Sequence, residues 1–207
     1  MYARTTTVRG DPGAISDGIA FVRDTVWPSM QGMSGCVGLS MLADRDAGRC
    51  IVTTAWATDE AMRASAESIR ELRSQTAEAL RADAVDVAEW EIAAMHRVHA
   101  AGEGACARVI WAEVDPARMD DMIDAFRMSL VPRMEQAPGF CSVSLMVDRS
   151  MGRATWAVTL ENRDALEETR ERAAAAREEF GPATGAQLTE VAEFEVALAH
   201  LRVPERA

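Results

Sequence analysis

The sequence predicts an α+β protein made of two tandem βαββαβ units, and three observations lead to this prediction. The stretch 35–62 recurs at 139–166, after a shift of 104 residues and without a gap. Both copies carry two alternating apolar runs around an Asp-Arg-x-x-Gly-Arg turn, which is typical of a β-hairpin. Helical periodicity flanks each hairpin, so each half reads strand, helix, strand, strand, helix, strand.

The repeat extends beyond the hairpins. Arg4 falls on Arg108, Asp11 on Asp115 and His96 on His200. Two copies are too few for a solenoid, whereas two halves of about 100 residues suit two similar domains. We therefore expect domains at 1–99 and 105–207, joined by a glycine-containing linker.

Four strands are expected in the first half. They are predicted at 3–9, 35–43, 49–57 and 86–97. Asp11 and Pro12 open the first helix, because Asp caps free amides and Pro suits a first helical turn. We expect that helix to end near Pro28, with a loop at 30–34, and a second helix from the Thr58 cap to about Leu80.

The second half repeats this plan. Strands are predicted at 106–114, in a hairpin over 139–161 and at 190–201, and helices at 116–130 and 163–180. Gly181 and Pro182 are expected to break the chain. Since helices cover one face of each antiparallel sheet, the other faces are expected to pack sheet to sheet and to close a barrel-like core.

The net charge, the apolar runs and the cysteines of the sequence limit the binding partners and the location that we expect for the protein. The net charge of −11 argues against nucleic acid and against an anionic membrane surface. No apolar run approaches the roughly 20 residues of a membrane span, and the N-terminus lacks a signal-peptide core, so we expect a cytoplasmic protein. The four cysteines form no CxxC pair and are expected to be free thiols, without a metal site.

Both copies resemble the antibiotic biosynthesis monooxygenase (ABM) domain over nearly their whole length. The resemblance rests on 35–62, with Trp56 before Thr58-Asp59-Glu60-Ala61, and on Ala137-Pro138-Gly139-Phe140 followed by Asp148-Arg149 and Gly152. That family belongs to the dimeric α/β-barrel superfamily, in which two ferredoxin-like units close a barrel. The resemblance thus implies two tandem ferredoxin-like units arranged as an intramolecular dimeric barrel.

The resemblance also implies an activity. Cofactor-free oxygenases of this superfamily use a Trp at the end of the third strand, matched here by Trp56 and replaced by Leu160 in the second half, and an Asn in the barrel. Asn162 starts a helix, so an N-cap also explains it. Haem-degrading members use a His on the second helix, which neither half has. We therefore expect no cofactor and no metal.

Three residues are candidates for catalysis: Trp56, Glu89 and His96. Arg4 and Arg108 lie on the first strands of the two halves, and the fourth strands, which are expected to be their neighbours, carry Glu89, Glu91, Glu193 and Glu195. Either each Glu forms an ion pair across the strands, or it lines a cavity where burial raises its pKa and it takes a proton from a phenol. Alternation places His96 on the face of Trp90 and Ile92, as a structural His or a base.

A substrate pocket is expected in the first half. Its candidate lining residues are Cys36, Gly38, Ser40, Val52 and Trp56. In the second half, Phe140 replaces Cys36, Ser142 replaces Gly38 and Trp156 replaces Val52, and Phe140 and Trp156 are expected to plug that pocket partly. The alternative is that all of these residues are core.

The leading prediction is a cofactor-independent monooxygenase-like enzyme acting on an aromatic, quinol or polyketide-like small molecule. The alternative is a non-catalytic small-molecule-binding or assembly module of the same fold. A homodimer of the tandem chain remains open.

Overall fold

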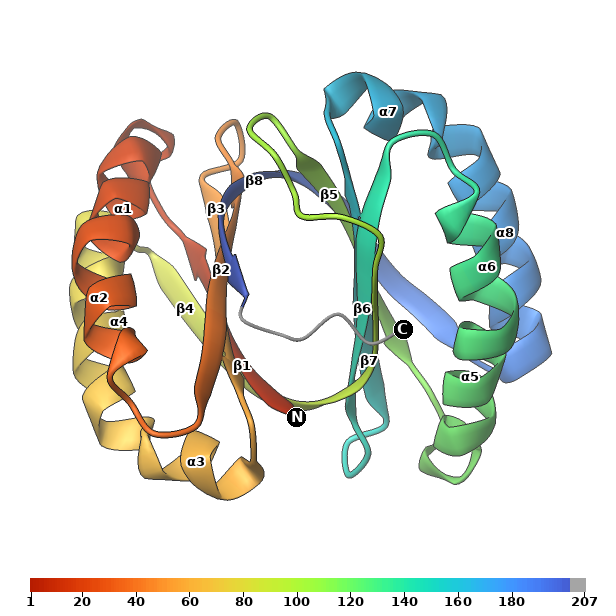
Figure 1. Ribbon diagram of the computed structural model, residues 1–207, viewed down its shortest axis with the longest axis horizontal. Coiled ribbons are helices and arrows are strands. Elements are labelled where there is room, and N and C mark those ends of the chain that lie inside the picture. Colours follow the sequence, from red (N-terminus) through yellow and green to blue (C-terminus); the bar gives the residue numbers. More distant parts are fainter. Residues whose placement is uncertain (202–207) are drawn as a thin grey trace. The chain divides into compact units, whose positions relative to one another are not determined.

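The computed structural model describes residues 1–201 (Figure 1). The chain divides into two compact units, which we call unit 1 (Met1–Trp90 with 196–201) and unit 2 (Glu91–Glu195). The division differs from the boundary predicted at the linker. Two long strands, β4 (Ala84–Arg97) and β8 (Gln187–Leu201), each begin in one unit and end in the other.

Unit 1 contains a sheet covered on one face by helices. The remaining strands are β1 (Tyr2–Arg9), β2 (Cys36–Asp44) and β3 (Arg49–Trp56). Strand β3 pairs antiparallel with both β1 and β2, and the order is β4, β1, β3, β2, β8. The helical segments are η1 (Pro12–Ala14), α1 (Ile15–Phe21), η2 (Val22–Val26), α2 (Trp27–Gln31), α3 (Asp59–Ala64) and α4 (Ala66–Ala79).

Unit 2 repeats this arrangement. Its strands β5 (Cys106–Glu113), β6 (Phe140–Asp148) and β7 (Arg153–Leu160) join the ends of β8 and β4 in the order β8, β5, β7, β6, β4. The helical segments are η3 (Pro116–Arg118), α5 (Met119–Ala125), η4 (Phe126–Leu130), α6 (Val131–Glu135), α7 (Arg163–Glu168) and α8 (Arg170–Thr184). Each half thus has the predicted order of strands and helices.

The first helix of each half continues past its proline, so the predicted end at Pro28 is wrong. Helix α2 continues to Gln31, and α6 continues past Pro132 to Glu135. A π-helical turn, η2 or η4, precedes each proline. Proline lacks an amide hydrogen and its ring collides with the carbonyl four residues earlier, and the wider turn accommodates both effects without ending the helix.

The second helices also differ from prediction. Each is divided in two, at Ser65 and at Thr169, whose hydroxyls donate to backbone carbonyls of the preceding turn. The predicted caps are confirmed, since the side chains of Thr58 and Asn162 accept hydrogen bonds from backbone amides of the first turn. Helix α8 continues through Pro182 and ends at Gly185, whose φ of 77° suits a left-handed C-terminal residue.

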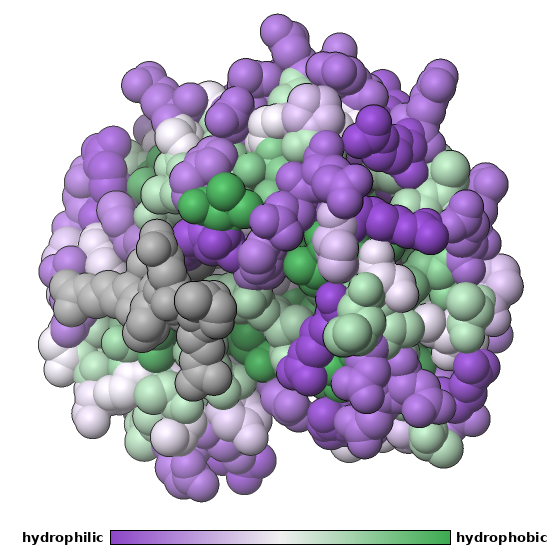
Figure 2. All heavy atoms as spheres, turned by 45° about the vertical axis from the view of Figure 1, so that its right-hand side comes forward, coloured by the Kyte–Doolittle hydropathy of each residue, from purple (hydrophilic) through white to green (hydrophobic). Residues whose placement is uncertain are grey.

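The surface seen in Figure 2 is mostly hydrophilic, with hydrophobic residues between the polar ones. Among the described residues, no helix has both the length and the apolar character needed to cross a bilayer. The same residues contain no group of three or more His, Cys, Asp or Glu placed to hold a metal ion.

Candidate functional site

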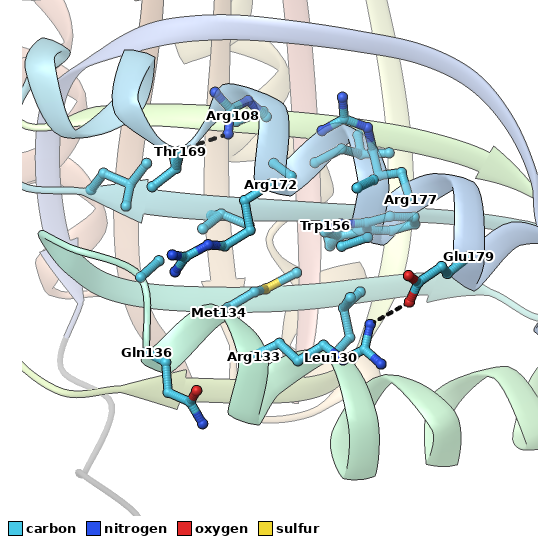
Figure 3. Close-up of a pocket in the computed structure, with 17 residues that line it drawn as sticks. Arg108, Leu130, Arg133, Met134, Gln136, Trp156, Thr169, Arg172, Arg177 and Glu179 are labelled. Atoms are coloured by element: carbon cyan, nitrogen blue, oxygen red, sulfur yellow. Dashed lines mark hydrogen bonds and ion pairs between the residues drawn. The ribbon is translucent and has the colours of Figure 1, made fainter.

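A cavity of about 480 Å³ lies within unit 2, between its sheet and its helices (Figure 3). Strands β5 and β7 form one wall, and η4, α6 and α8 supply the others. This volume lies in the range of small-molecule sites. The apolar lining residues are Ile110, Leu130, Met134, Ala137, Trp156, Val158, Leu160, Ala173, Ala175 and Ala176.

Trp156 forms a rigid part of the sheet wall. Alternation along β7 directs Ala154, Trp156 and Leu160 into the core that the helices cover. The indole is 1% exposed and makes edge-to-face contacts with Phe126 and Phe180, at centroid distances of 5.9 and 6.0 Å. Such contacts fix the orientation of the ring, which gives the cavity a preformed aromatic wall.

At three matched positions around the cavity, unit 2 has smaller residues than unit 1. Leu160 matches Trp56 in the repeat. On the covering helix, Ala173 matches Ile69 and Ala176 matches Leu72. The three large residues of unit 1 pack into its core, with Trp56 fully buried. Unit 1 therefore fills with side chains the region that unit 2 leaves open.

The polar part of the lining is strongly cationic. The charged residues that line the cavity are four arginines and one glutamate. The arginines are Arg108, Arg133, Arg172 and Arg177, and the glutamate is Glu179. Two of the arginines are paired: Arg133 Nη1 lies 2.6 Å from Glu179 Oε2, and Arg108 Nη2 lies 2.9 Å from Oε1 of Glu193 on β8. The first pair is marked in Figure 3.

Arg108 is held by a network that recurs in unit 1. Its Nη2 also donates to the carbonyl of Leu166 at 2.7 Å, and its side chain is 3% exposed. In unit 1, Arg4 Nη2 donates to Glu89 Oε1 at 2.7 Å and to the carbonyl of Met62 at 3.0 Å. The predicted Arg–Glu ion pairs across neighbouring strands are thus confirmed.

These contacts decide the role of Glu193. Burial alone would raise the pKa of this carboxyl, but hydrogen bonds from Arg170 and Arg108, with their charges, outweigh burial and lower the pKa. Arg163 lies 3.9 Å away and adds a third positive charge. A carboxylate with a lowered pKa is a weaker base, so this geometry disfavours the alternative in which Glu193 takes a proton from a phenol.

The other two arginines have no such partner. Among the described residues, neither Arg172 nor Arg177 makes a hydrogen bond or an ion pair. Arg172 is exposed at the edge of the cavity, while Arg177 is half-buried. Burial lowers the pKa of Arg177, and the charge of Arg108 lowers it further, while the charges of Glu193 and Glu178 oppose part of this shift. The residues that line the cavity therefore carry more positive than negative charge above an apolar floor.

The three predicted catalytic residues are not brought together. Trp56 and Glu89 belong to unit 1, where the indole Nε1 donates to Thr54 Oγ1 at 3.1 Å and Glu89 binds Arg4. His96 belongs to unit 2, where its ring stacks on Phe140 and its Nε2 lies 3.4 Å from Glu135 Oε2. None of the three lines the cavity.

The predicted face of His96 is wrong because β4 contains a bulge. The register shifts between Ile92 and Ala94, so that Ile92 pairs with Met146 while His96 pairs with Val143. Val143 belongs to the core that the helices cover. An extra residue in a strand reverses the alternation beyond it, which places His96 on the face opposite to Ile92.

The residues predicted to bind substrate are divided between two faces of the unit 1 sheet. Val52 and Trp56 lie in the core beneath the helices, together with Cys36, which a bulge before Gly38 brings opposite Trp56. Gly38 and Ser40 pair with Ala55 and Thr53, which alternate with those core positions. The five side chains therefore do not line one cavity.

The cavity described above also differs in place from the predicted pocket. It lies in the second half, where Trp156 forms a wall instead of a plug, and Phe140 does not line it. Strand residues alone do not reveal it. The missed signal is the run of four alanines at 173–176, which places small side chains on a helix facing the sheet.

The four cysteines are free thiols and lie outside this lining. Cys141 is fully buried, and burial, with a smaller contribution from the charge of Glu161, raises its pKa to about 11. A thiol with so high a pKa is a poor nucleophile near neutral pH, so we assign Cys141 no role in catalysis.

No family model matches the chain. Two proteins of Mycobacterium tuberculosis, the uncharacterized proteins Rv2557 and Rv2558, are each 46% identical to it. The matches cover 99% of this chain and 91% and 87% of the respective relatives. The sequence similarity therefore covers both halves of the chain and is not limited to one of them.

Solved structures share the fold at low sequence identity. A candidate monooxygenase from Lactobacillus acidophilus superposes with a TM-score of 0.70 at 13% identity, covering 97% of this chain and 96% of that one. An anthrone oxidase-like protein gives 0.66 at 14%, covering 100% and 95%. A ferredoxin-fold protein of Listeria monocytogenes related to antibiotic biosynthesis monooxygenases gives 0.53 at 5%, covering 94% of each chain. The fold is monooxygenase-like.

Proposed function

The chain belongs to the family of the mycobacterial proteins Rv2557 and Rv2558, and we propose that it is a cofactor-independent, monooxygenase-like enzyme for an aromatic small molecule. The quinol and polyketide-like compounds expected from the sequence fall within this class. The observation that carries the proposal is the unit 2 cavity, which combines an aromatic wall with arginines in a monooxygenase-like fold.

The reaction that fits this lining begins with an ionised substrate. An electron-rich hydroxyaromatic compound, such as a quinol or the enol form of anthrone, can reduce oxygen directly once it loses its proton. Arg172 and Arg177 supply positive charge where the anion forms, and an anion is stabilised most where water is largely excluded. The proton passes to solvent at the exposed edge of the cavity, which Arg172 and Glu179 form.

Anthrone illustrates the balance of the reaction. Its methylene carbon loses two hydrogens and gains one oxygen atom from O₂ as a carbonyl, while the second oxygen atom leaves as water. The substrate itself provides all the electrons, so no cofactor is required. Trp156 and Leu160 would hold the flat ring system against the sheet.

The test is oxygen uptake with anthrone, measured with the protein as it stands. We expect one O₂ consumed per anthrone, and loss of this activity in Leu160→Trp, which introduces the large residue of unit 1. Ala174→Leu is the matched control, since Ala174 neighbours the cavity alanines but does not line the cavity. Binding of an aromatic probe without oxygen uptake would instead support the non-catalytic binding module. Absence of both would refute a ligand site in unit 2.

A further inference from the structure

We propose that the unit 2 cavity selects an apolar molecule carrying one anionic group, and that the positive charges of Arg172 and Arg177 attract that group. The inference deepens the proposed function and rests on it, because it assumes that this cavity binds a ligand. It names the charge of the ligand and two residues that determine specificity.

Pairing between the lining charges supports this inference. Glu193 binds Arg108 and Glu179 binds Arg133, so these two arginines are already neutralised by partners at hydrogen-bond distance. Arg172 and Arg177 remain, both on α8 and both part of the lining. Figure 3 shows Arg172 and Arg177 extending from the same helix beside the cavity, with their guanidinium groups pointing in different directions. A single guanidinium group can bind a carboxylate or a similar oxyanion through two parallel hydrogen bonds.

The overall charge of the protein makes this local excess informative. The chain carries a net charge of −11, so its average field repels anions. An apolar cavity in such a protein would ordinarily favour neutral ligands. Arginines at its lining reverse that preference locally, and the partial burial of Arg177 strengthens a hydrogen bond from this residue to an anion.

The repeat provides an internal comparison. Arg73 of unit 1 matches Arg177, and burial together with the charge of Arg4 lowers its pKa in the same way. A purely structural role for Arg177 would therefore be shared by Arg73. Arg172 has no such counterpart, because its matched residue is Ser68. Arg172 is thus present only in the unit that has the cavity, as expected for a residue that binds a ligand there.

The experiment uses two fluorescent probes with one skeleton. Phenylnaphthylamine is neutral, and anilinonaphthalene sulfonate carries one permanent negative charge. In fluorescence titrations, we expect Arg172→Gln and Arg177→Gln each to weaken binding of the sulfonate by about tenfold. Binding of the neutral probe should change less than about threefold. Arg172→Lys should restore part of the sulfonate affinity, since it keeps the charge but loses the paired hydrogen bonds.

Arg73→Gln is the matched control and should leave the affinity of both probes unchanged. Competition with naphthoate and naphthol then separates two sources of the anion. Displacement by naphthoate alone indicates a carboxylate ligand, whereas displacement by naphthol with a red-shifted absorption indicates a phenol ionised in place. Either result supports the inference.

The failures are distinguishable. If the neutral probe binds and Leu160→Trp blocks it, but the arginine variants affect both probes equally, the inference is overturned and the proposed cavity stands. The same conclusion follows if Arg73→Gln matches Arg177→Gln. If neither probe binds the folded protein, the proposed function fails together with the inference.

Discussion

Substituting Ala176 with leucine should stabilise the protein and weaken its ligand binding at the same time. Leucine is the residue that unit 1 has at the matched position, Leu72, where it packs against the core. In unit 2 the added side chain points into a cavity of about 480 Å³ beside Trp156 and Leu160. There is room for it without displacement of the sheet.

The size of the effect follows from the three carbon atoms that the substitution adds. Each buried methylene contributes about 0.8 kcal/mol, so the upper bound is roughly 2.4 kcal/mol. Partial exposure of this helix position and imperfect fit reduce the gain, and we expect about 1–2 kcal/mol. For a chain of this length, that gain corresponds to an increase in Tm of about 2–8 °C.

Urea unfolding and phenylnaphthylamine titration measure the two effects on the same sample. We expect the free energy of unfolding to rise and the probe affinity to fall by about tenfold or more, because the ligand must compete with leucine for space. Damage to the fold would lower both quantities. Ala174→Leu, outside the lining, should leave the affinity unchanged.

The outcome that would refute this reasoning is unchanged probe affinity in a folded Ala176→Leu protein. The probe would then bind elsewhere, and the alanines of α8 would not form the site. A loss of stability with normal affinity would likewise mean that the space beside Ala176 is already filled.

Three further predictions follow from individual residues. Trp56→Ala should cost about 3–5 kcal/mol in urea unfolding, because it removes the largest fully buried side chain of unit 1; a cost below about 1 kcal/mol would contradict its place in the core. Glu193→Gln should lower stability at pH 7 by about 2–4 kcal/mol. Because the folded pKa of Glu193 is lowered, its contribution to stability is present above the ordinary pKa of about 4.3 and is lost as pH falls through the folded pKa. The free energies of unfolding of the two proteins should therefore converge in acid. A constant difference down to pH 2 would argue against this linkage. Cys141, with a pKa raised to about 11, should react with iodoacetamide at pH 8 much more slowly than the half-buried Cys36, as peptide mass spectrometry would reveal; equal rates would contradict the burial of Cys141.

Much of the fold could be predicted from the sequence because the signals are local and occur twice. Each hairpin turn begins with Asp-Arg and contains a glycine, Gly48 or Gly152, with a φ of 62°. Glycine adopts such a positive φ without steric strain. The helix caps Thr58 and Asn162 are likewise local, since each depends on one side chain and one amide. Such features need no knowledge of tertiary packing.

The ends of the first helices and the faces of the bulged strands could not be predicted in this way. Pro28 and Pro132 would end a regular α-helix, but a π-helical turn accommodates them at the cost of one extra residue. A bulge near Ile92 has a similar effect on a strand, because one additional residue reverses every later side chain. Neither device is visible in composition or periodicity.

The candidate site was harder to predict than the fold, because the size of a cavity depends on side chains from elements that meet only in the folded protein. Leu160 and Ala176 are ordinary residues alone, and they leave space only when a strand and a helix bring them to the same place. Comparison of the two halves along the helices as well as the strands would have added the replacement of Ile69 and Leu72 by alanine to the replacement of Trp56 by Leu160.

The exchanged strand ends have a consequence for synthesis on the ribosome. Unit 1 contains 196–201, which are translated after every other described residue of the chain, and β2 is the neighbour of the strand that they form. The N-terminal half therefore cannot complete its sheet while it emerges, even though nearly all of its residues are already available. Contacts of such high sequence separation slow folding and leave an unpaired strand edge exposed in the meantime. We therefore expect the strand edge of β2 to stay exposed until synthesis is nearly complete.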